Sequence, residues 1–213
     1  MQKVVIVGSG GHAKVIIDIF RSAGVYEPLG CTDVLSKDKK VAGVPVLGDD
    51  SILPKLFSDS IKYAFIALGD NAVRARLAKR VKEIGFELVN AVSPHSYVSA
   101  SARMGSGIAI MPGAVVNPEA TIGDNVIINT GASVDHDCVI EAFCHIAPGC
   151  SIAGNVKIGR GSLLGIGSVV IPNVTVGEWS VLGAGSVVTC DLPGRSVALG
   201  FPAKVVKELR GGT

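Results

Sequence analysis

The sequence predicts two units of different architecture. Residues 1–92 are expected to form a small Rossmann-like α/β domain with a parallel sheet, and residues 93–213 an all-β left-handed parallel β-helix with a C-terminal tail. Two observations support this. In the first part, short apolar runs alternate with stretches of helical periodicity, which is typical of a parallel α/β sheet. In the second part, aliphatic side chains recur at every sixth residue, which is typical of a coil built from short strands.

The elements of the first unit are expected in the order strand, helix, strand, strand, helix, strand. The strands fall at residues 3–7, 29–33, 62–68 and 87–92, and the helices at residues 11–23 and 71–84. In the first helix Val15, Ile16, Ile19 and Phe20 follow helical spacing, and Gly24 comes next as a stop signal. A parallel sheet with crossover helices follows from this order.

A glycine-rich turn joins the first strand to the first helix. The run GSGGHA at residues 8–13 fits the dinucleotide pattern G-x-G-x-x-G/A, and Asp33 ends the next strand, as in NAD-binding folds. The first unit is only half the size of a dinucleotide fold, however, and no hydride-transfer partner follows. Free amides at a helix N-terminus hold any phosphate, so a nucleotide-linked sugar fits this turn as well as NAD does.

The second unit keeps its period of six without a slip. The aliphatic positions are Val98, Met104, Ile110, Val116, Ile122, Ile128, Val134, Ile140, Ile146, Ile152, Ile158, Leu164, Val170, Val176, Leu182 and Val188. Two residues before each stands a smaller side chain, mostly Ala, Ser, Cys or Val. We interpret both positions as the interior of a triangular coil. Glycine often follows the aliphatic residue directly, which should ease the turn.

The register of the coils also explains most of the cysteines. Cys138, Cys144 and Cys150 occupy consecutive small interior positions, so they are expected in the core on three different faces. The total of five cysteines is odd and contains no CxxC pair, which disfavours a disulfide framework and a structural zinc site. Such coils are stable only when several stack. Because β-helices of this type usually trimerise, we expect a homotrimer.

Composition excludes several classes of function. Twenty basic and eighteen acidic residues nearly balance, and no basic stripe with interleaved aromatic residues is present, so nucleic-acid binding is not expected. The uncharged stretch at residues 161–177 is broken by glycines, a proline and an asparagine, so it is not expected to span a membrane. The N-terminus enters a strand without a long apolar segment, which favours a cytoplasmic location.

Histidines supply a candidate base but not a metal site. A zinc site like that of the γ-class carbonic anhydrases needs three histidines, and of the four in this chain His12 and His95 lie outside the coils. We therefore expect no metal. His136 stands two residues beyond an interior valine, on an outward corner, where it could take a proton during acyl transfer. Asp137 is the nearer partner for its ring, with Asp135 as the alternative.

On spacing alone, a histidine between two aspartates also fits a solvated corner. The stretch VDHDCVIEAFCHIAPGCSIAGN at residues 134–155 and the repeat around it, however, resemble the sialic-acid O-acetyltransferase and bacillosamine-pathway N-acetyltransferase group of hexapeptide acyltransferases. The resemblance covers nearly the whole chain. It implies that His136 is the general base and Asp137 its partner, where the family usually has Glu. His145 is similar to a family histidine near the thioester, although a surface or trimer-interface role is equally open.

The same resemblance implies where the substrates bind. Acetyl-CoA would lie between neighbouring subunits, against the backbone of Ala153, Gly154, Gly165, Ile166, Gly183 and Ala184, with Lys204 near a phosphate. The fold also requires these glycines. The nucleotide sugar would contact Ser9, Gly10, His12, Lys14, Thr32, Asp33, Gly69 and Asn71. His12 could instead cap or pack the helix, and Lys14 could be solvated. Arg74 follows this last loop, and Asp70 stands where the family usually has Asn.

These residues imply one reaction and leave two alternatives. The expected activity is transfer of an acetyl group from acetyl-CoA to the 4-amino group of a nucleotide-linked, UDP-type 4-amino-4,6-dideoxy sugar by direct attack on the thioester. The same residues could catalyse O-acetylation of sialic acid or a related sugar. A non-catalytic scaffold that binds a nucleotide sugar is the alternative from another class, since a β-helix alone does not fix function.

Overall fold

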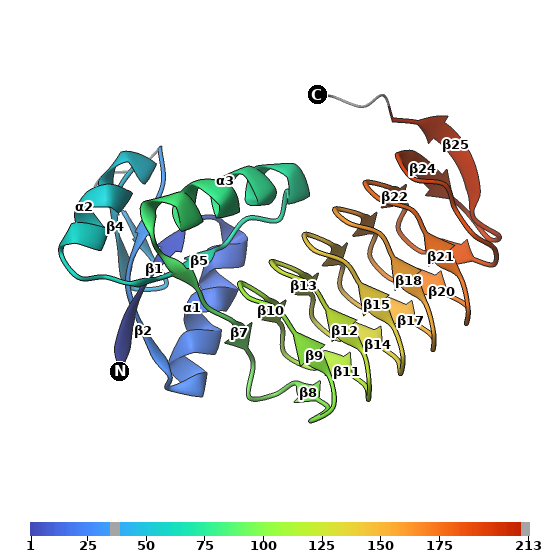
Figure 1. The fold of residues 1–213 in the computed structure, drawn as a ribbon, viewed down its shortest axis with the longest axis horizontal. Helices are drawn as coiled ribbons and strands as arrows, with labels where there is room; N and C mark the ends of the chain where they lie inside the picture. The colour runs from blue at the N-terminus through green and yellow to red at the C-terminus, as the bar shows by residue number, and fades with distance from the viewer. Residues whose placement is uncertain (35–38, 210–213) are drawn as a thin grey trace. The chain divides into compact units, whose positions relative to one another are not determined.

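The structure, a computed structural model, describes residues 1–34 and 39–209. The chain divides into two compact units, Met1–Pro94 and His95–Thr213 (Figure 1). Within the described residues, no helix combines the length and the apolar character needed to cross a membrane.

The first unit is built on a sheet with the strand order β3-β4-β2-β1-β5-β6. Its strands are β1 (Gln2–Val7), β2 (Tyr26–Thr32), β3 (Lys40–Val41), β4 (Val44–Gly48), β5 (Tyr63–Ile66) and β6 (Glu87–Leu88), and β7 (Ala91–Val92) follows them. The expected parallel sheet is confirmed, since β1 pairs in parallel with both β2 and β5. Among the described strands of this sheet, β3 alone runs antiparallel, in a hairpin with β4.

The two predicted helices begin and end where expected, α1 at Gly11–Ala23 and α3 at Asn71–Ile84. Gly24 caps α1 in the left-handed conformation and donates to the Phe20 carbonyl. Ile16, Ile19 and Phe20 are buried as expected, but Val15 is exposed because at 100° per residue it lies off their face. The sequence pattern predicts no element in the segment that forms β3, β4, the 3₁₀ turn η1 (Asp50–Ile52) and α2 (Leu53–Ser58).

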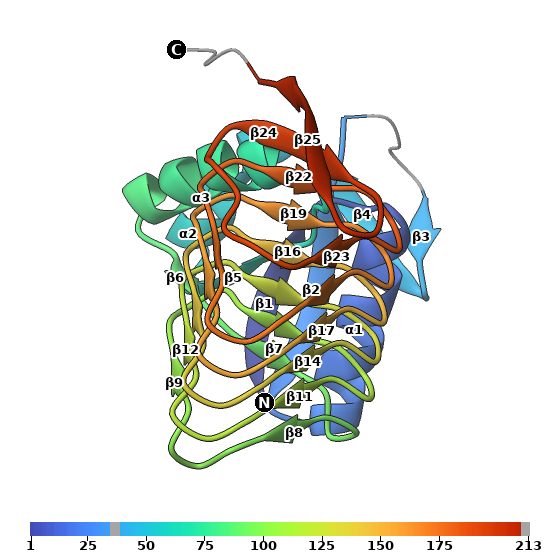
Figure 2. The ribbon, with the colours of Figure 1, turned by 90° about the vertical axis from the view of Figure 1, so that its right-hand side faces the viewer.

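The second unit is a stack of three-stranded coils, in which each strand pairs with the strand one coil away (Figure 2). The first face contains β8 (Tyr97–Val98), β11 (Val115–Val116), β14 (Ser133–Val134), β17 (Ser151–Ile152), β20 (Val169–Val170) and β23 (Val187–Val188). The second contains β9 (Arg103–Met104), β12 (Thr121–Ile122), β15 (Val139–Ile140), β18 (Lys157–Ile158) and β21 (Thr175–Val176). The third contains β10 (Ala109–Ile110), β13 (Ile127–Ile128), β16 (His145–Ile146), β19 (Leu163–Leu164), β22 (Val181–Leu182), β24 (Ser196–Leu199) and β25 (Lys204–Glu208).

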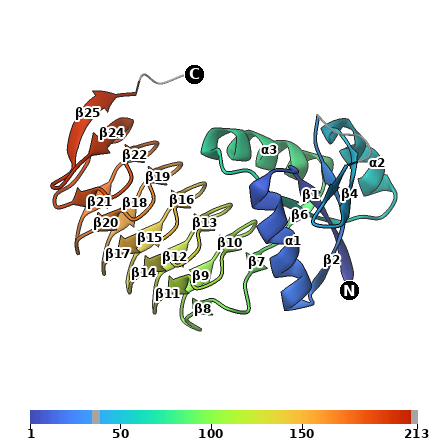
Figure 3. The same ribbon diagram turned by 180° about the vertical axis from the view of Figure 1, so that it is seen from behind.

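The register of this stack is constant up to β23. Partner residues lie one coil of 18 residues apart, for example Thr121 opposite Val139, whereas the last coil is shorter and pairs Val181 of β22 with Val197 of β24. All these pairs are parallel until β24, where β25 folds back antiparallel and ends the stack (Figure 3). Each coil thus pairs its strands with those of its neighbours, and unpaired strand edges are left at the two ends of the stack.

The predicted interior is confirmed. From Ile110 to Val188, every aliphatic position of the six-residue period is buried, with at most 2% of its surface exposed. Each contributes about 1.5–3 kcal/mol from burial alone. Val98 is half-buried and Met104 is exposed, because β8 and β9 are the edge strands of their faces.

The small interior residues have a hydrogen-bonding role. The thiols of Cys138, Cys144 and Cys150 are buried as predicted, and each donates at 3.1 Å to the carbonyl 15 residues ahead. Ser162 makes the same bond to the carbonyl of Gly177 at 2.8 Å. Burial is the main cause that raises the pKa of Cys138 and Cys150, which keeps both thiols protonated as donors.

The glycines after the aliphatic positions have a different role from the one expected. The left-handed turn occurs two residues later, for instance at Asp137 with φ 60° and Gly161 with φ 70°. Gly123 and Gly159 are instead needed for close packing, since a Cβ there would lie 2.6 Å from the Ala142 nitrogen and 2.5 Å from the Glu178 nitrogen. The expectation that these glycines ease the turn is therefore wrong.

Candidate active site

His136 lies on the corner between β14 and β15, as the register predicts. Its side chain is 60% exposed, and its Nδ1 is 2.8 Å from Oδ2 of Asp137. Because a carboxylate only accepts, Nδ1 carries the proton and Nε2 keeps its lone pair. The pair therefore presents a basic nitrogen to solvent on an outward corner of the coil.

Asp135, the alternative partner, serves the backbone. Its Oδ1 accepts the His136 backbone N–H at 2.8 Å and the Asn117 side-chain amide at 3.0 Å. Asn117 was not identified from the sequence, although it stands one coil before Asp135 and the repeat could have revealed it. The two aspartates thus have different partners: Asp135 accepts hydrogen bonds from the backbone and from Asn117, and Asp137 accepts one from the His136 ring.

Electrostatics favour protonation of His136. The hydrogen bond that the His136 ring donates to Asp137 is the main cause that raises the pKa of His136, and the negative charges of Asp135 and Asp137 add to it. Desolvation acts in the opposite direction. A ring that gains a proton in a reaction is stabilised by the adjacent carboxylate, which is what a general base requires.

His145 lies elsewhere, on the outward side of β16, and is half-buried. Its Nε2 is 3.1 Å from Nδ2 of Asn129, whose Oδ1 accepts the Thr130 backbone N–H at 2.8 Å. This second contact orients the amide, so Asn129 donates to Nε2 and the proton of His145 is on Nδ1. The Nε2 atom of His145 thus accepts from an amide, whereas the Nδ1 atom of His136 donates to a carboxylate.

The glycine-rich turn of the first unit has the geometry of an anion site. Gly8 has φ 108°, and a Cβ there would lie 3.0 Å from the Ala67 carbonyl oxygen. Gly10 is the N-cap of α1 and supplies no side-chain cap, and the first turn of the helix contains no acidic residue. The positive end of the helix dipole is therefore available to a phosphate.

The loop after β5 lies beside this turn, because β1 and β5 are neighbours where the strand order reverses, which is where open α/β sheets bind ligands. Asp70 accepts the Val73 N–H at 2.8 Å and so caps α3. The buried Arg74 donates to the carbonyls of Leu68 and Gly69 and to Oδ1 of Asn71 at 2.8–3.1 Å. The predicted residues Gly69 and Asn71 are thus held in place by a cation beneath them.

A cavity of about 140 Å³ opens at the carboxyl ends of these strands. Its lining residues are Val7, Gly8, Thr32, Asp33, Val34, Asp50, Leu68 and Leu77. The Ser9 hydroxyl donates to Asp33, and the Thr32 hydroxyl donates to Asp50. The structure therefore brings the predicted residues Ser9, Thr32 and Asp33 together. Asp50 was not predicted from the sequence, because its partner Thr32 ends a different strand and lies 18 residues earlier in the chain.

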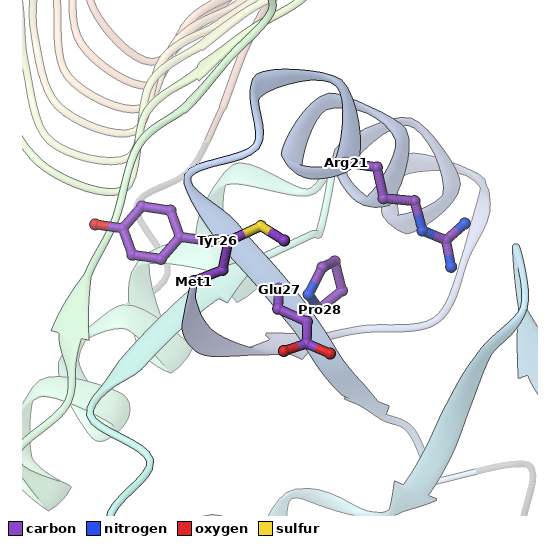
Figure 4. Close-up of a pocket in the computed structure, with 5 residues that line it drawn as sticks. All are labelled: Met1, Arg21, Tyr26, Glu27 and Pro28. Carbon is purple, nitrogen blue, oxygen red and sulfur yellow. The ribbon is translucent and has the colours of Figure 1, made fainter.

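Two further predicted residues, His12 and Lys14, belong to α1 beside this turn. His12 is half-buried in the first turn of the helix, and Lys14 is exposed. A larger hollow of about 240 Å³, lined by Met1, Arg21, Tyr26, Glu27 and Pro28 (Figure 4), lies at the amino ends of β1 and β2. It is at the edge of the sheet opposite the glycine turn, so it does not fit the usual ligand position.

Comparison with solved structures places the whole chain in a family. A structure of a histidine-to-alanine mutant of the Caulobacter crescentus GDP-perosamine N-acetyltransferase, in complex with CoA and GDP-perosamine, is 44% identical and has a TM-score of 0.94 over 98% of both chains. The chain belongs to the acetyl-CoA-dependent sugar N-acetyltransferases of the hexapeptide-repeat class.

Further relatives of these sugar N-acetyltransferases agree with this assignment. The acetyltransferase domain of PglB from Neisseria gonorrhoeae FA1090 is 35% identical with a TM-score of 0.93, over 97% of this chain and 100% of that one. The PglD N-terminal domain family matches residues 3–81, and the bacterial transferase hexapeptide family (six repeats) matches residues 155–190.

Curated relatives match over shorter segments. The UDP-N-acetylbacillosamine N-acetyltransferase of Bacillus subtilis is 36% identical over 117 residues, which cover 52% of each protein. An uncharacterized protein of Acanthamoeba polyphaga mimivirus, L142, is 32% identical over 104 residues and is matched over 20% of its length. The chain thus spans about half or less of the curated relatives it matches.

The residues that the sugar N-acetyltransferase family implies for coenzyme A lie on two separate corners. Ala153 and Gly154 follow β17, on the corner of His136 one coil further on. Gly165, Ile166, Gly183 and Ala184 follow β19 and β22, on the corner where the third face meets the first. Lys204 begins β25 and is exposed.

At these corners an elongated ligand could approach the backbone amides of the protein closely. Their residues have small or absent side chains apart from Ile166, which is 62% exposed. Across residues 1–34 and 39–209, no group of three or more His, Cys, Asp or Glu side chains is placed to hold a metal ion.

Proposed function

We propose that this chain transfers the acetyl group of acetyl-CoA to the 4-amino group of a nucleotide-linked 4-amino-4,6-dideoxy sugar, with His136 as general base. The observation that carries the proposal is the exposed His136–Asp137 pair, with its Nδ1–Oδ2 distance of 2.8 Å. The solved Caulobacter crescentus relatives support it, because they contain CoA and GDP-perosamine, and two of them are mutants of one histidine.

The chemistry balances with the groups present. The neutral amino group attacks the thioester carbonyl carbon while Nε2 of His136 accepts its proton, and Asp137 stabilises the imidazolium that forms. The tetrahedral oxyanion is stabilised by a backbone amide of the coil wall. When the C–S bond breaks, the coenzyme A thiolate takes the proton from His136, and the products are the amide and the free thiol.

The nucleotide is the less defined part of the substrate. The sequence resemblance implies UDP, and a UDP-sugar enzyme matches half of the chain. The relative named for GDP-perosamine matches 98% of the chain at higher identity. We therefore take a GDP-linked amino sugar as the first acceptor to test and a UDP-linked one as the second.

A homotrimer is part of the proposal. The corner that carries His136 and the corner that carries Gly165 and Ala184 are different edges of one coil stack. If coenzyme A contacts both, the second corner comes from a neighbouring subunit, and the site lies between subunits.

The deciding experiment supplies acetyl-CoA and a panel of GDP-, UDP- and dTDP-linked amino sugars and weighs the products. One acceptor should gain an acetyl mass, and mild alkali should leave it attached, because an amide survives conditions that hydrolyse an ester. Loss of the acetyl group in alkali would favour the O-acetyltransferase instead. His136→Ala should lower kcat by about 10²–10⁴-fold. Binding without acetylation of any acceptor would favour the non-catalytic scaffold.

A further inference from the structure

We propose that Gly154 is a positioning residue for His136. Because Gly154 has no side chain, the imidazole of His136 can occupy the space where a Cβ would lie. The inference rests on the proposed role of His136 as general base. It gives Gly154 a task other than contact with coenzyme A.

Gly154 occupies the corner position of His136 one coil further along the stack. Ser133 pairs with Ser151 in the parallel ladder, so the residues three beyond each strand start, His136 and Gly154, lie above one another. The backbone ladder continues through the corner, where the Asn155 N–H donates to the His136 carbonyl at 3.0 Å. The column is therefore rigid at the point where the ring meets it.

The ring and a side chain at position 154 exclude each other. A Cβ at Gly154 would lie 2.5 Å from Cε1, 2.6 Å from Nε2 and 3.1 Å from Nδ1 of His136. The first two distances are well inside van der Waals contact. Gly154 is buried, and it is not among the glycines with positive φ, so its backbone tolerates an L residue. The three heavy atoms nearest to that Cβ position all belong to the imidazole.

Other corner glycines of the stack differ in this respect. A Cβ at Gly159 would lie 2.5 Å from the Glu178 nitrogen, and one at Gly165 would lie 2.6 Å from the Ala184 nitrogen. Those neighbours are backbone and cannot move without disturbing the coil. At Gly154 the neighbour is an exposed side chain that can turn away. Alanine at 154 should therefore spare the fold and displace the base.

Displacement would have a defined chemical effect. The ring is held by Asp137 at Nδ1, while Asp135 and Asn117 hold the backbone beneath it. Turning the ring away from position 154 breaks the contact with Asp137 and moves Nε2. Misplacement of a reacting group by about 1 Å can cost about 10²-fold in rate.

The experiment compares Gly154→Ala with Gly159→Ala in the full chain. Gly154→Ala should melt within a degree or two of wild type and lose about 10–10²-fold in kcat, with KM for acetyl-CoA and for the sugar nucleotide changed less than about two-fold. Gly159→Ala should show the reverse pattern, with a lower melting temperature as its main effect. Gly154→Ala should also move the acidic limb of the kcat/KM profile to lower pH, because the ring loses the Asp137 contact that raises its pKa.

A double-mutant cycle separates positioning from coenzyme binding. Added to His136→Ala, Gly154→Ala should cause no further loss of rate, since its effect passes through the ring. The inference is wrong if Gly154→Ala keeps wild-type kcat, if it raises KM for acetyl-CoA equally with and without His136, or if it abolishes cooperative unfolding. Full activity of His136→Ala would instead overturn the proposed function, so the two failures are distinguishable.

Discussion

Two histidines on one coil stack have different neighbours. Asp137 fixes the proton of His136 on Nδ1 and leaves Nε2 as an acceptor, whereas Asn129 donates to Nε2 of His145 and leaves its proton on Nδ1. The difference comes from one neighbour in each case, a carboxylate or an amide. It shows that the residue type alone does not decide which histidine can act as a base.

Replacing Asp137 tests this arrangement through pH. The proposed base must be unprotonated, so kcat/KM should rise with pH through the pKa of His136, which Asp137 raises above its ordinary value. In Asp137→Asn that acidic limb should move to lower pH, and the pH-independent rate should fall by about 10–10²-fold because the imidazolium loses its partner. Rates measured from pH 5 to pH 9 give both quantities. Asp135→Asn is the comparison, and an equal shift there would contradict the assignment of Asp137 as the ring partner.

The sequence predicts where His136 and its neighbouring aspartates lie on the coil, but not which aspartate contacts the ring. The period of six put His136 on an outward corner, and the structure agrees. It could not decide between Asp135 and Asp137, because both flank the ring and only the φ of 60° at Asp137 distinguishes their backbones. Asp50 and Asn129 were missed because each acts through a residue 16 or 18 positions away.

The coil is held by a repeated bond from one turn to the next. A thiol or hydroxyl at the small interior position donates to a carbonyl 15 residues ahead, as Cys144 does to Gly159 and Ser162 does to Gly177. A buried carbonyl that loses its donor costs free energy that no neighbouring water can restore. This explains why cysteine or serine stands at positions where alanine would fill the space.

Ser162→Ala should therefore lower the free energy of unfolding by about 1–3 kcal/mol, since the donor to Gly177 is lost. Ser162→Cys should lower it less, because a thiol makes the same bond at Cys144 and Cys150. Urea unfolding at one fixed protein concentration measures both, so that association does not enter the comparison. Equal losses in the two variants would show that packing, not the donor, sets the stability of this position.

Elements were predictable where a period was long. Thirteen or more residues of helical spacing located α1 and α3 to the residue. The segment from β3 to α2 consists of pieces of two to six residues, too short for a period to emerge. The role of Gly123 and Gly159 was also hidden, because a periodic pattern gives the place of a residue in its coil but not its distance from the next coil.

The two units supply different parts of the proposed reaction. The glycine turn, the Arg74-supported loop and the cavity with Asp33 belong to the first unit, and the His136 corner belongs to the second. The phosphate site of the first unit depends on the uncapped N-terminus of α1, and the position of His136 depends on a corner of the coil. The family match over 98% of the chain is what joins them into one enzyme.

Mixed trimers test whether a site is shared between subunits. His136→Ala removes the base from one corner, and Ala184→Trp should block the other corner by bulk. Each variant alone should be inactive, but if the two corners of a site come from different subunits, a refolded equal mixture should recover up to about a quarter of wild-type activity. Light scattering should give a mass near three times 21.8 kDa for each sample. A mixture as inactive as its parents, at that mass, would place both corners of each site in one subunit.

Because the register of the coil stack is constant from β8 to β23, the stack can gain or lose length only by whole coils. Removing a single residue between residues 108 and 188 would turn every later interior side chain outward, whereas removing 18 residues would leave each remaining ladder pair intact. The distance between strands is about 4.8 Å, so the stack can lengthen or shorten only in steps of that size. The distance along the stack between the His136 corner and β25 can therefore change only by whole coils if the ladder is kept.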